Sequence, residues 1–171
     1  MSKKPKLYPP VTVEALLLRE GALSGYIPDL AFSRVFEIIG MIYPKGKSTT
    51  ESDLIPIIRK GLTKKHLESL MMTTGLNLTA MAQILHVSER TMHRYAKDTL
   101  LNPEISERLL EIAKLYAKGQ DVFGGLEPFK KWLQDPVIAL GNKKPLHFLD
   151  TSIGIRLLED ELGRIEHGIF S

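Results

Sequence analysis

The chain has no cysteine among its 171 residues, and this absence excludes several kinds of chemistry at once. Disulfide bonds, thiolate zinc sites and cysteine nucleophiles all require a thiol group. The apolar runs are short, and none approaches the roughly 20 residues that a membrane-spanning helix needs. The basic start, from Met1 to Lys6, is not followed by the apolar stretch and small-residue cleavage site of a secretory signal. We therefore expect a cytoplasmic protein that does not contact a membrane.

Motifs of catalysis and metal binding are also missing. The five histidines include no His-x-x-x-His pair, which makes a zinc site improbable. Gly46-Lys47-Ser48 resembles the end of a phosphate-binding loop, but methionine stands at position 41, where that motif needs glycine. The acidic run 159–161 would point to several sides of a helix, which indicates a solvated face rather than a catalytic pair. The sequence predicts no catalytic residue, no metal site, no cofactor and no enzymatic activity.

The residues that are present follow helical periodicity. Hydrophobic residues make up 43% and charged residues 25% of the chain, as in a globular protein. Residues three and four apart share one face of a helix. Three apolar stripes have this spacing: Leu30, Val35, Ile38, Ile39 and Ile42; Ile105, Leu109, Ile112 and Tyr116; and Ile155, Leu158, Leu162 and Ile165. No stretch shows the sustained period-two alternation of a strand, so the sequence predicts an all-α fold.

Several helix ends can be placed as well. The first stripe predicts a helix after Asp29 that Gly40 closes. Asn102-Pro103 combines a capping side chain with a first-turn proline, and Gly119 supplies a stop for that helix. Residues 123–133 form a short aromatic-rich helix whose Trp132 we expect in the core.

Charge is distributed unevenly along the chain. Residues 1–100 carry 14 basic and 9 acidic side chains, a net charge of +5, whereas residues 101–171 carry 9 and 11, a net charge of −2. A basic part suits phosphate, and a mildly acidic part suits a protein partner. We expect an N-terminal helical extension at 1–60, to which no chemistry can be assigned, a helix-turn-helix domain at 61–100 and a further helical domain at 101–171.

Residues 76–95 have the pattern of a helix-turn-helix. Ala82 is the small residue that lets the second helix cross closely, and Met92 is the apolar anchor of that second helix. Leu85 and Val87 flank the turn as its apolar pins. His86 stands at the turn, where glycine is frequent because the backbone there is left-handed; histidine tolerates that region better than most residues.

The second helix predicts a DNA-reading surface, because the N-terminal residues of such a helix meet base edges in the major groove. Ser88 would cap it, and Arg90 and Arg94, four apart on one face, are the expected readers of guanine. The predicted DNA contacts are Ser88, Glu89, Arg90, His93, Arg94 and Lys97, with Lys64 and Lys65 as further phosphate contacts. Glu89 would accept from cytosine or hold Arg90 or His93 in place. A helix-turn-helix usually reads two half-sites, so we expect a homodimer. The alternative is a helical hairpin whose charges only face water.

The C-terminal part carries two ordered motifs. Residues 139–151 read Ala-Leu-Gly-x-x-x-Pro-Leu-x-x-Leu-Asp-Thr, and residues 162–170 read Leu-Gly-Arg-Ile-Glu-x-Gly-x-Phe. Over residues 100–171 the chain resembles the toxin-binding domain of Xre/ParS-type antitoxins, which also place a helix-turn-helix before it. The resemblance implies an all-α fold, self-association, repression of its own operon by binding operator DNA, and neutralisation of a cognate toxin. We therefore also expect a higher toxin–antitoxin hetero-oligomer. The toxin of such pairs is commonly a RES-domain enzyme that consumes NAD.

The same resemblance implies that the extreme C-terminus plugs the toxin's active site. Gly168-Ile169-Phe170-Ser171 would place an apolar pair on a glycine at the terminus, where chains fray unless they are tied down. The predicted toxin contacts are Arg164, Glu166, His167, Gly168, Ile169, Phe170 and Ser171. Alternatively, Ile169 and Phe170 fold back on the chain's own core. Two other readings stay open: a transcription regulator without a toxin, and a toxin-binding protein that no longer binds DNA, which His86 and Glu89 would favour.

Overall fold

The computed structural model describes residues 26–44 and 49–168, and every regular element within them is helical. The first five helices are α2 (Tyr26–Ile38), α3 (Glu51–Lys60), α4 (Lys64–Thr74), α5 (Leu78–Ile84) and α6 (Glu89–Arg94). They are followed by α7 (Pro103–Phe123), α8 (Leu126–Gln134), two 3-10 turns, η1 (Ile138–Leu140) and η2 (Pro145–Phe148), and α9 (Ser152–Glu166). The prediction of an all-α fold is confirmed.

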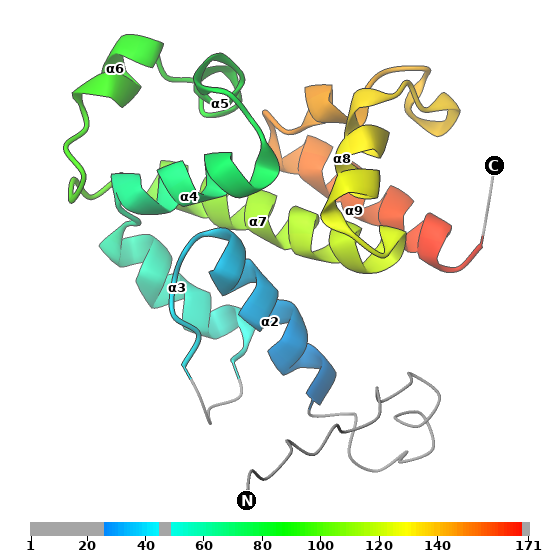
Figure 1. Ribbon diagram of the computed structural model, residues 1–171, viewed down its shortest axis with the longest axis horizontal. Helices are drawn as coiled ribbons and strands as arrows, with labels where there is room; N and C mark the ends of the chain where they lie inside the picture. Colours follow the sequence, from blue (N-terminus) through cyan, green and yellow to red (C-terminus); the bar gives the residue numbers. More distant parts are fainter. Residues whose placement is uncertain (1–25, 45–48, 169–171) are drawn as a thin grey trace, which may run out of the picture.

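The long helix α7 is the centre of the molecule (Figure 1). Helices from before it in the chain (α2, α3, α4) and after it (α8, α9) pack against it. The Asn102 side chain accepts a hydrogen bond from the Ile105 amide and Pro103 occupies the first turn, as predicted. The predicted stripe is buried along the helix: Ile105, Leu109, Ile112 and Tyr116.

Gly119 does not end α7, which is a correction to the sequence prediction. The helix continues to Phe123, and Gly124 ends it with a left-handed φ of +71°. Gly119 is instead the point where α8 approaches most closely, because the Phe129 ring fills the space that a side chain would need. Phe129 is fully buried, packs edge-on against Tyr116 at 5.1 Å and stacks with half-buried Trp132 at 5.8 Å.

Two further expectations need correction. The sequence predicts Ile42 on the first helical stripe, but α2 ends at Ile38, and Ile42 is 92% exposed after Gly40 turns the chain with φ +68°. Glu161 was assigned to a solvated face, but it is only 8% exposed. An Arg164 guanidinium nitrogen lies 2.7 Å from a Glu161 carboxylate oxygen, and this ion pair offsets the free-energy cost of burying the negative charge.

No helix within the described ranges is both long and apolar enough to cross a membrane.

Candidate DNA-binding and toxin-binding surfaces

Helices α5 and α6 form a compact hairpin at one end of the molecule (Figure 1). Ala82 and Leu85 are buried, and the anchor Met92 is 1% exposed. The Val87 amide donates to the Ala82 carbonyl at 3.0 Å, which closes the tight turn between the helices. The small residue, the turn and the anchor thus occupy the positions that the sequence predicted.

The turn itself depends on His86. Its φ is +54°, and Asn142 is the other non-glycine residue with positive φ among those described. Such a conformation costs about 1 kcal/mol or more for a residue with a β-carbon. The imidazole Nε2 lies 2.9 Å from the backbone oxygen of Asp150, 64 residues further along the chain. A carbonyl oxygen only accepts, so Nε2 is the donor. The left-handed backbone was predictable, whereas this long-range contact was not.

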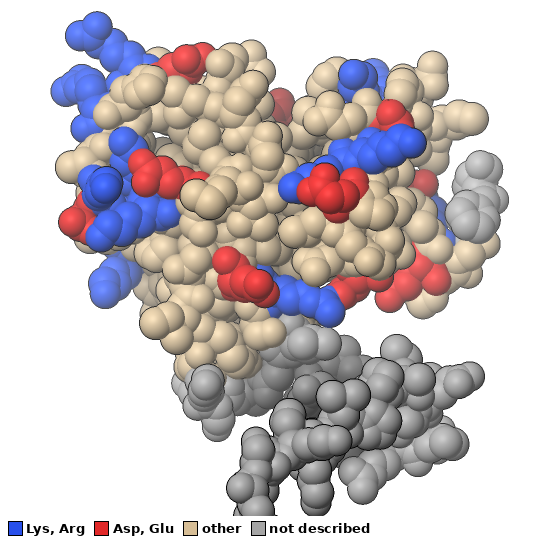
Figure 2. All heavy atoms as spheres, viewed as in Figure 1, with Lys and Arg blue, Asp and Glu red and all other residues tan. Residues whose placement is uncertain are grey.

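Helix α6 begins at a side-chain cap. The Ser88 hydroxyl oxygen accepts from the Thr91 amide at 3.0 Å, as expected for an N-cap serine. All six predicted DNA contacts are solvent-exposed: Ser88, Glu89, Arg90, His93, Arg94 and Lys97. In Figure 2, Lys and Arg side chains gather on the left side, over α6, its connection to α7 and the adjoining ends of α3 and α4. The arrangement offers cationic side chains around one short exposed helix.

The predicted phosphate contacts Lys64 and Lys65 already have acidic partners. Lys65 Nζ lies 2.6 Å from the Asp98 carboxylate, and the hydrogen bond and charge of Lys65 lower the pKa of Asp98. Lys64 Nζ is 3.7 Å from Glu68. The Lys65–Asp98 pair is open to solvent and the Lys64–Glu68 pair is long, so both are weak and DNA phosphates can compete for the lysines.

Sequence reasoning missed two exposed cations at the end of α3, Arg59 and Lys60. They precede Gly61, whose α-carbon lies so close to the Leu101 carbonyl that a β-carbon would be 2.4 Å from that oxygen. The end of α3 is therefore held beside the α6–α7 connection. The available signal was the pair of basic residues in the last helical turn before glycine.

The connection from α6 to α7 is fastened to the start of α4. The Leu101 amide donates to the Leu62 carbonyl at 2.7 Å, and the Lys64 amide donates to the Thr99 carbonyl at 3.2 Å. The Leu62 amide in turn donates to the Ser106 hydroxyl, which is fully buried in α7. The far end of the exposed helix is thereby fixed to the core.

The motif at residues 139–151 has a structural explanation. Leu140 and Leu149 are buried, and Gly141 takes a left-handed φ of +67° between them. Pro145 opens η2, where its fixed φ suits a first turn. Thr151 caps α9 by accepting from the Gly154 amide at 3.0 Å. The two leucines thus anchor this segment in the core, while Gly141, Pro145 and Thr151 set its bend, its turn and the cap of α9.

Helix α9 buries one stripe and exposes another. Ile155, Leu158 and Leu162 are buried, as predicted, whereas Ile165, the last residue of the predicted stripe, is only half-buried. On the opposite face, Ile153 is 73% and Leu157 38% exposed. This exposed apolar stripe runs toward the C-terminal end of the helix, where the predicted toxin contacts begin.

The predicted toxin contacts that the structure describes are all exposed: Arg164, Glu166, His167 and Gly168. Arg164 is oriented by its ion pair with Glu161. Ile169, Phe170 and Ser171 lie outside the described residues.

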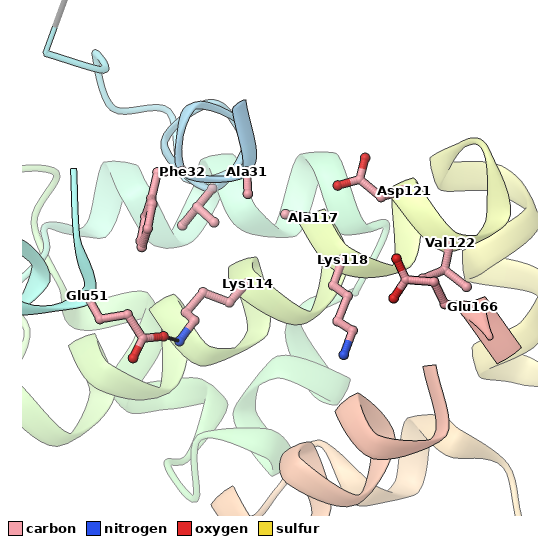
Figure 3. Close-up of a pocket in the computed structure, with 10 residues that line it drawn as sticks. Ala31, Phe32, Glu51, Lys114, Ala117, Lys118, Asp121, Val122 and Glu166 are labelled. Carbon is pink, nitrogen blue, oxygen red and sulfur yellow. Dashed lines mark hydrogen bonds and ion pairs between the residues drawn. The ribbon is translucent and has the colours of Figure 1, made fainter. Parts of the chain in front are cut away.

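A groove of about 410 Å³ lies where α2, α3, α7 and α9 meet (Figure 3). Apolar side chains such as Phe32 and Val35 line one part, and Lys114 reaches across to pair with Glu51. On the neighbouring face of α9, burial raises the pKa of Glu159, opposed by the charges of Lys114 and Lys118. No group of His, Asp or Glu within residues 26–44 and 49–168 could hold a metal ion.

The hairpin, its basic surroundings and the appended helices define a helix-turn-helix protein with a second helical domain. Residues 53–114 match the family model of the antitoxin Xre-like helix-turn-helix domain. Residues 118–168 match that of the antitoxin Xre/MbcA/ParS C-terminal toxin-binding domain. The chain belongs to the Xre-type antitoxins, with both of their domains in the expected order. It is the antitoxin of a toxin–antitoxin system.

Two curated relatives agree with this assignment. The chain is 27% identical over 120 residues to "Antitoxin Xre" of Yersinia enterocolitica, covering 69% of this chain and 81% of that protein. It is 29% identical over 129 residues to the "Prs ADP-ribosylating antitoxin" of a Sphingobium species, covering 70% and 81%.

Proposed function

We propose that this antitoxin represses its own operon through α6 and silences a cognate toxin through the end of α9. The observation that carries the first half is the exposed face of α6, where Arg90 and Arg94 stand four residues apart beyond the Ser88 cap. The second half rests on the toxin-binding family match and on the exposed end of α9. Its role is regulatory rather than catalytic, and it would act in the cytoplasm, where operator DNA and toxin meet.

On DNA, Arg90 and Arg94 would donate to guanine in the major groove, since arginine matches the two guanine acceptors. His93, Lys97 and the Arg59–Lys60 pair would contact phosphates, with Glu89 accepting from cytosine or orienting Arg90. Residues 61–100 would provide all of these contacts except those of Arg59 and Lys60, and residues before 61 would brace them. A homodimer would present two such helices to two half-sites about one DNA turn apart.

On the toxin, residues 101–171 would provide the contacts. Ile153 and Leu157 supply an apolar stripe that leads to Arg164, Glu166 and His167, and residues 168–171 would enter the toxin's active site. Exposed apolar side chains at the centre of a polar rim are the usual anchors of a protein interface. A larger toxin–antitoxin hetero-oligomer would follow, because each protomer of the dimer carries one such surface.

The toxin is proposed to be a RES-type enzyme that consumes NAD. The family resemblance supports this, and so does the name of the Sphingobium relative, which refers to ADP-ribosylation, a reaction that usually draws ADP-ribose from NAD.

Growth of a bacterial host tests toxin neutralisation. The gene beside this one is expressed alone, with the full chain, and with a chain that ends at Gly168. We expect growth arrest, rescue by the full chain, and loss of rescue on truncation. Rescue by the truncated chain would show that residues 169–171 are not needed to neutralise the toxin. The remaining surface of α9 would then be the proposed toxin contact. A neighbour that does not arrest growth would leave the toxin assignment without support.

A salt titration tests the DNA half. Binding to the DNA upstream of the gene is measured from about 50 to 200 mM salt, over which phosphate-contacting proteins lose affinity steeply. Absence of binding at the lowest salt would favour the alternative that this chain binds a toxin but no longer binds DNA. The exposed, acidic Glu89 on α6 would be consistent with that alternative.

A further inference from the structure

We infer that His86 is a positioning residue that connects the helix-turn-helix to the toxin-binding domain, so that each binding surface influences the other. The inference rests on the hydrogen bond between the His86 imidazole and the Asp150 backbone oxygen, at 2.9 Å. One partner lies in the turn directly before α6, and the other lies directly before α9. It therefore links the starts of the two helices that carry the proposed DNA and toxin contacts.

The backbone at position 86 supports a role for this side chain. Glycine would adopt φ +54° without strain, yet the chain places histidine there. The imidazole is solvent-exposed, so the burial of apolar surface does not account for it. What the ring gains at this position is the hydrogen bond to Asp150. A strained residue whose side chain makes a specific long-range contact is a sound basis for a functional hypothesis.

The acceptor lies in a firmly held segment. Asp150 precedes Thr151, the cap of α9, and Gly154 fits so tightly against the Phe148 carbonyl that a β-carbon would be 2.0 Å from its oxygen. The Ser152 hydroxyl donates to Glu111 of α7 at 3.2 Å. We therefore expect a displacement at the start of α9 to move the Asp150 oxygen as well, because the chain between them is held in place.

The donor side of the hydrogen bond borders a small crevice. A crevice of about 20 Å³ lies between the turn and the start of α7, lined by Ile84, Leu85, His86, Glu104, Ile105 and Arg108. His86 thus borders the start of α7 and also reaches the segment before α9 through its hydrogen bond to the Asp150 oxygen.

The consequence depends on the proposed function. Ile153, the first exposed apolar residue of the proposed toxin surface, lies three residues after Asp150. A toxin seated on α9 would alter the freedom of Asp150, and through His86 the freedom of α6. Because coupling between two binding sites is reciprocal, bound DNA would change toxin affinity by the same factor.

A double-mutant cycle tests the link without DNA or toxin. Amide exchange is followed by NMR at Val87 and Met92, whose amides donate within the turn and α6. In the otherwise unchanged chain, Thr151→Ala removes the α9 cap and should raise exchange at both amides, about fivefold for a coupling of ordinary size. In His86→Gly, which keeps the left-handed turn and lacks the ring, Thr151→Ala should have no such effect. Equal responses in both backgrounds, or no response in either, would overturn the inference.

Two variants control this cycle. His86→Asn also tolerates positive φ, but its shorter side chain does not reach as far, so it should behave like His86→Gly. Gln83→Ala, an exposed change on α5, should respond like the unchanged chain. If His86→Asn responded to Thr151→Ala like the unchanged chain and Gln83→Ala did not, the effect would come from the turn backbone. That result would overturn the role of the ring.

The functional measurement uses DNA upstream of the gene and the protein encoded beside it. Saturating partner protein should change the Kd for DNA about fivefold or more with the unchanged chain, and have little effect with His86→Gly. An undiminished change with His86→Gly would overturn the inference. If the chain binds neither DNA nor the partner, the proposed function fails, and the exchange cycle alone decides whether His86 connects the domains.

Discussion

The ring of Phe129 lies directly on the α-carbon of Gly119, so close that a β-carbon there would be 2.4 Å from ring carbon Cδ2. Gly119→Ala must therefore displace a fully buried ring that also packs against Tyr116. Overpacking of this kind costs about 1–3 kcal/mol, against which alanine recovers up to about 1 kcal/mol of helix propensity. We expect a net loss of stability, measured by chemical denaturation.

Gly163 provides the matched control. It also lies inside a helix, but its nearest neighbour, Lys118 Nζ, would be 3.8 Å from a β-carbon. Gly163→Ala should be neutral or stabilising, by up to about 1 kcal/mol. A Gly119→Ala variant as stable as Gly163→Ala would contradict the close approach of α8.

The start of α4 should make stability dependent on pH. The Thr63 amide donates to His66 Nδ1 at 2.9 Å, which requires that nitrogen to be unprotonated. Burial, together with the charge of Lys65, lowers the pKa of His66 below its ordinary 6.5. The unfolded chain therefore binds the proton more readily. The stability that neutral His66 contributes is present above pH 6.5 and is lost as the pH falls through the lowered pKa.

His66→Gln isolates this effect, because glutamine can also accept from the Thr63 amide but does not titrate. Denaturation midpoints compared from pH 7.5 to 5 should fall more steeply in the unchanged chain than in the variant. Parallel curves would show that other groups cause the acid destabilisation.

On the exposed face of α6, loss of a base contact and loss of a phosphate contact should have different effects on DNA binding. Arg90→Ala or Arg94→Ala should weaken binding to the upstream DNA by about 1–3 kcal/mol, roughly 5- to 150-fold in Kd, and relax specificity at one base pair. Lys97→Ala, the loss of a phosphate contact, should weaken binding to all sequences and reduce the salt slope by about 1. Lys131→Ala on α8 is the control, and toxin binding should remain intact in all four variants.

The apolar stripe of α9 should matter for toxin binding only. Ile153→Asp combined with Leu157→Asp adds charge to a face that is already exposed, so the fold should survive. Partner binding should fall by tenfold or more, since buried unpaired charge at an interface costs several kcal/mol. Ile138→Asp, at another exposed isoleucine, on η1, is the comparison in the same domain. If Ile138→Asp abolishes binding and the α9 change does not, the toxin contacts η1 rather than the exposed stripe of α9.

Local patterns predicted much of the architecture. The helix-turn-helix was recognisable because its small residue, turn, cap and anchor lie within about 15 residues of one another, and local geometry alone constrains them. The same holds for the Asn102-Pro103 start of α7 and the buried stripes of α7 and α9. Charge and exposure on α6 followed directly from its register.

Features that depend on distant partners were missed. Glycine often ends a helix, so the sequence predicts a helix end at Gly119. Its actual role, close contact with the Phe129 ring of α8, depends on a residue in another helix. Glu161 lies in an acidic run, which predicts a solvated side chain. In the structure it is buried and forms an ion pair with Arg164, one helical turn further on. The hydrogen bond from His86 to Asp150 spans 64 residues, and no spacing rule reaches that far.

Helix α7 also constrains how such antitoxins can exchange parts. The two family matches end at residue 114 and resume at residue 118, so the seam between them lies inside one unbroken helix. Each residue inserted there would rotate everything beyond it by about 100° and advance it by about 1.5 Å. A recombined gene that acquires a new toxin specificity must therefore preserve helical phase at its junction, and a hybrid shifted by a single codon would present its toxin surface in the wrong direction.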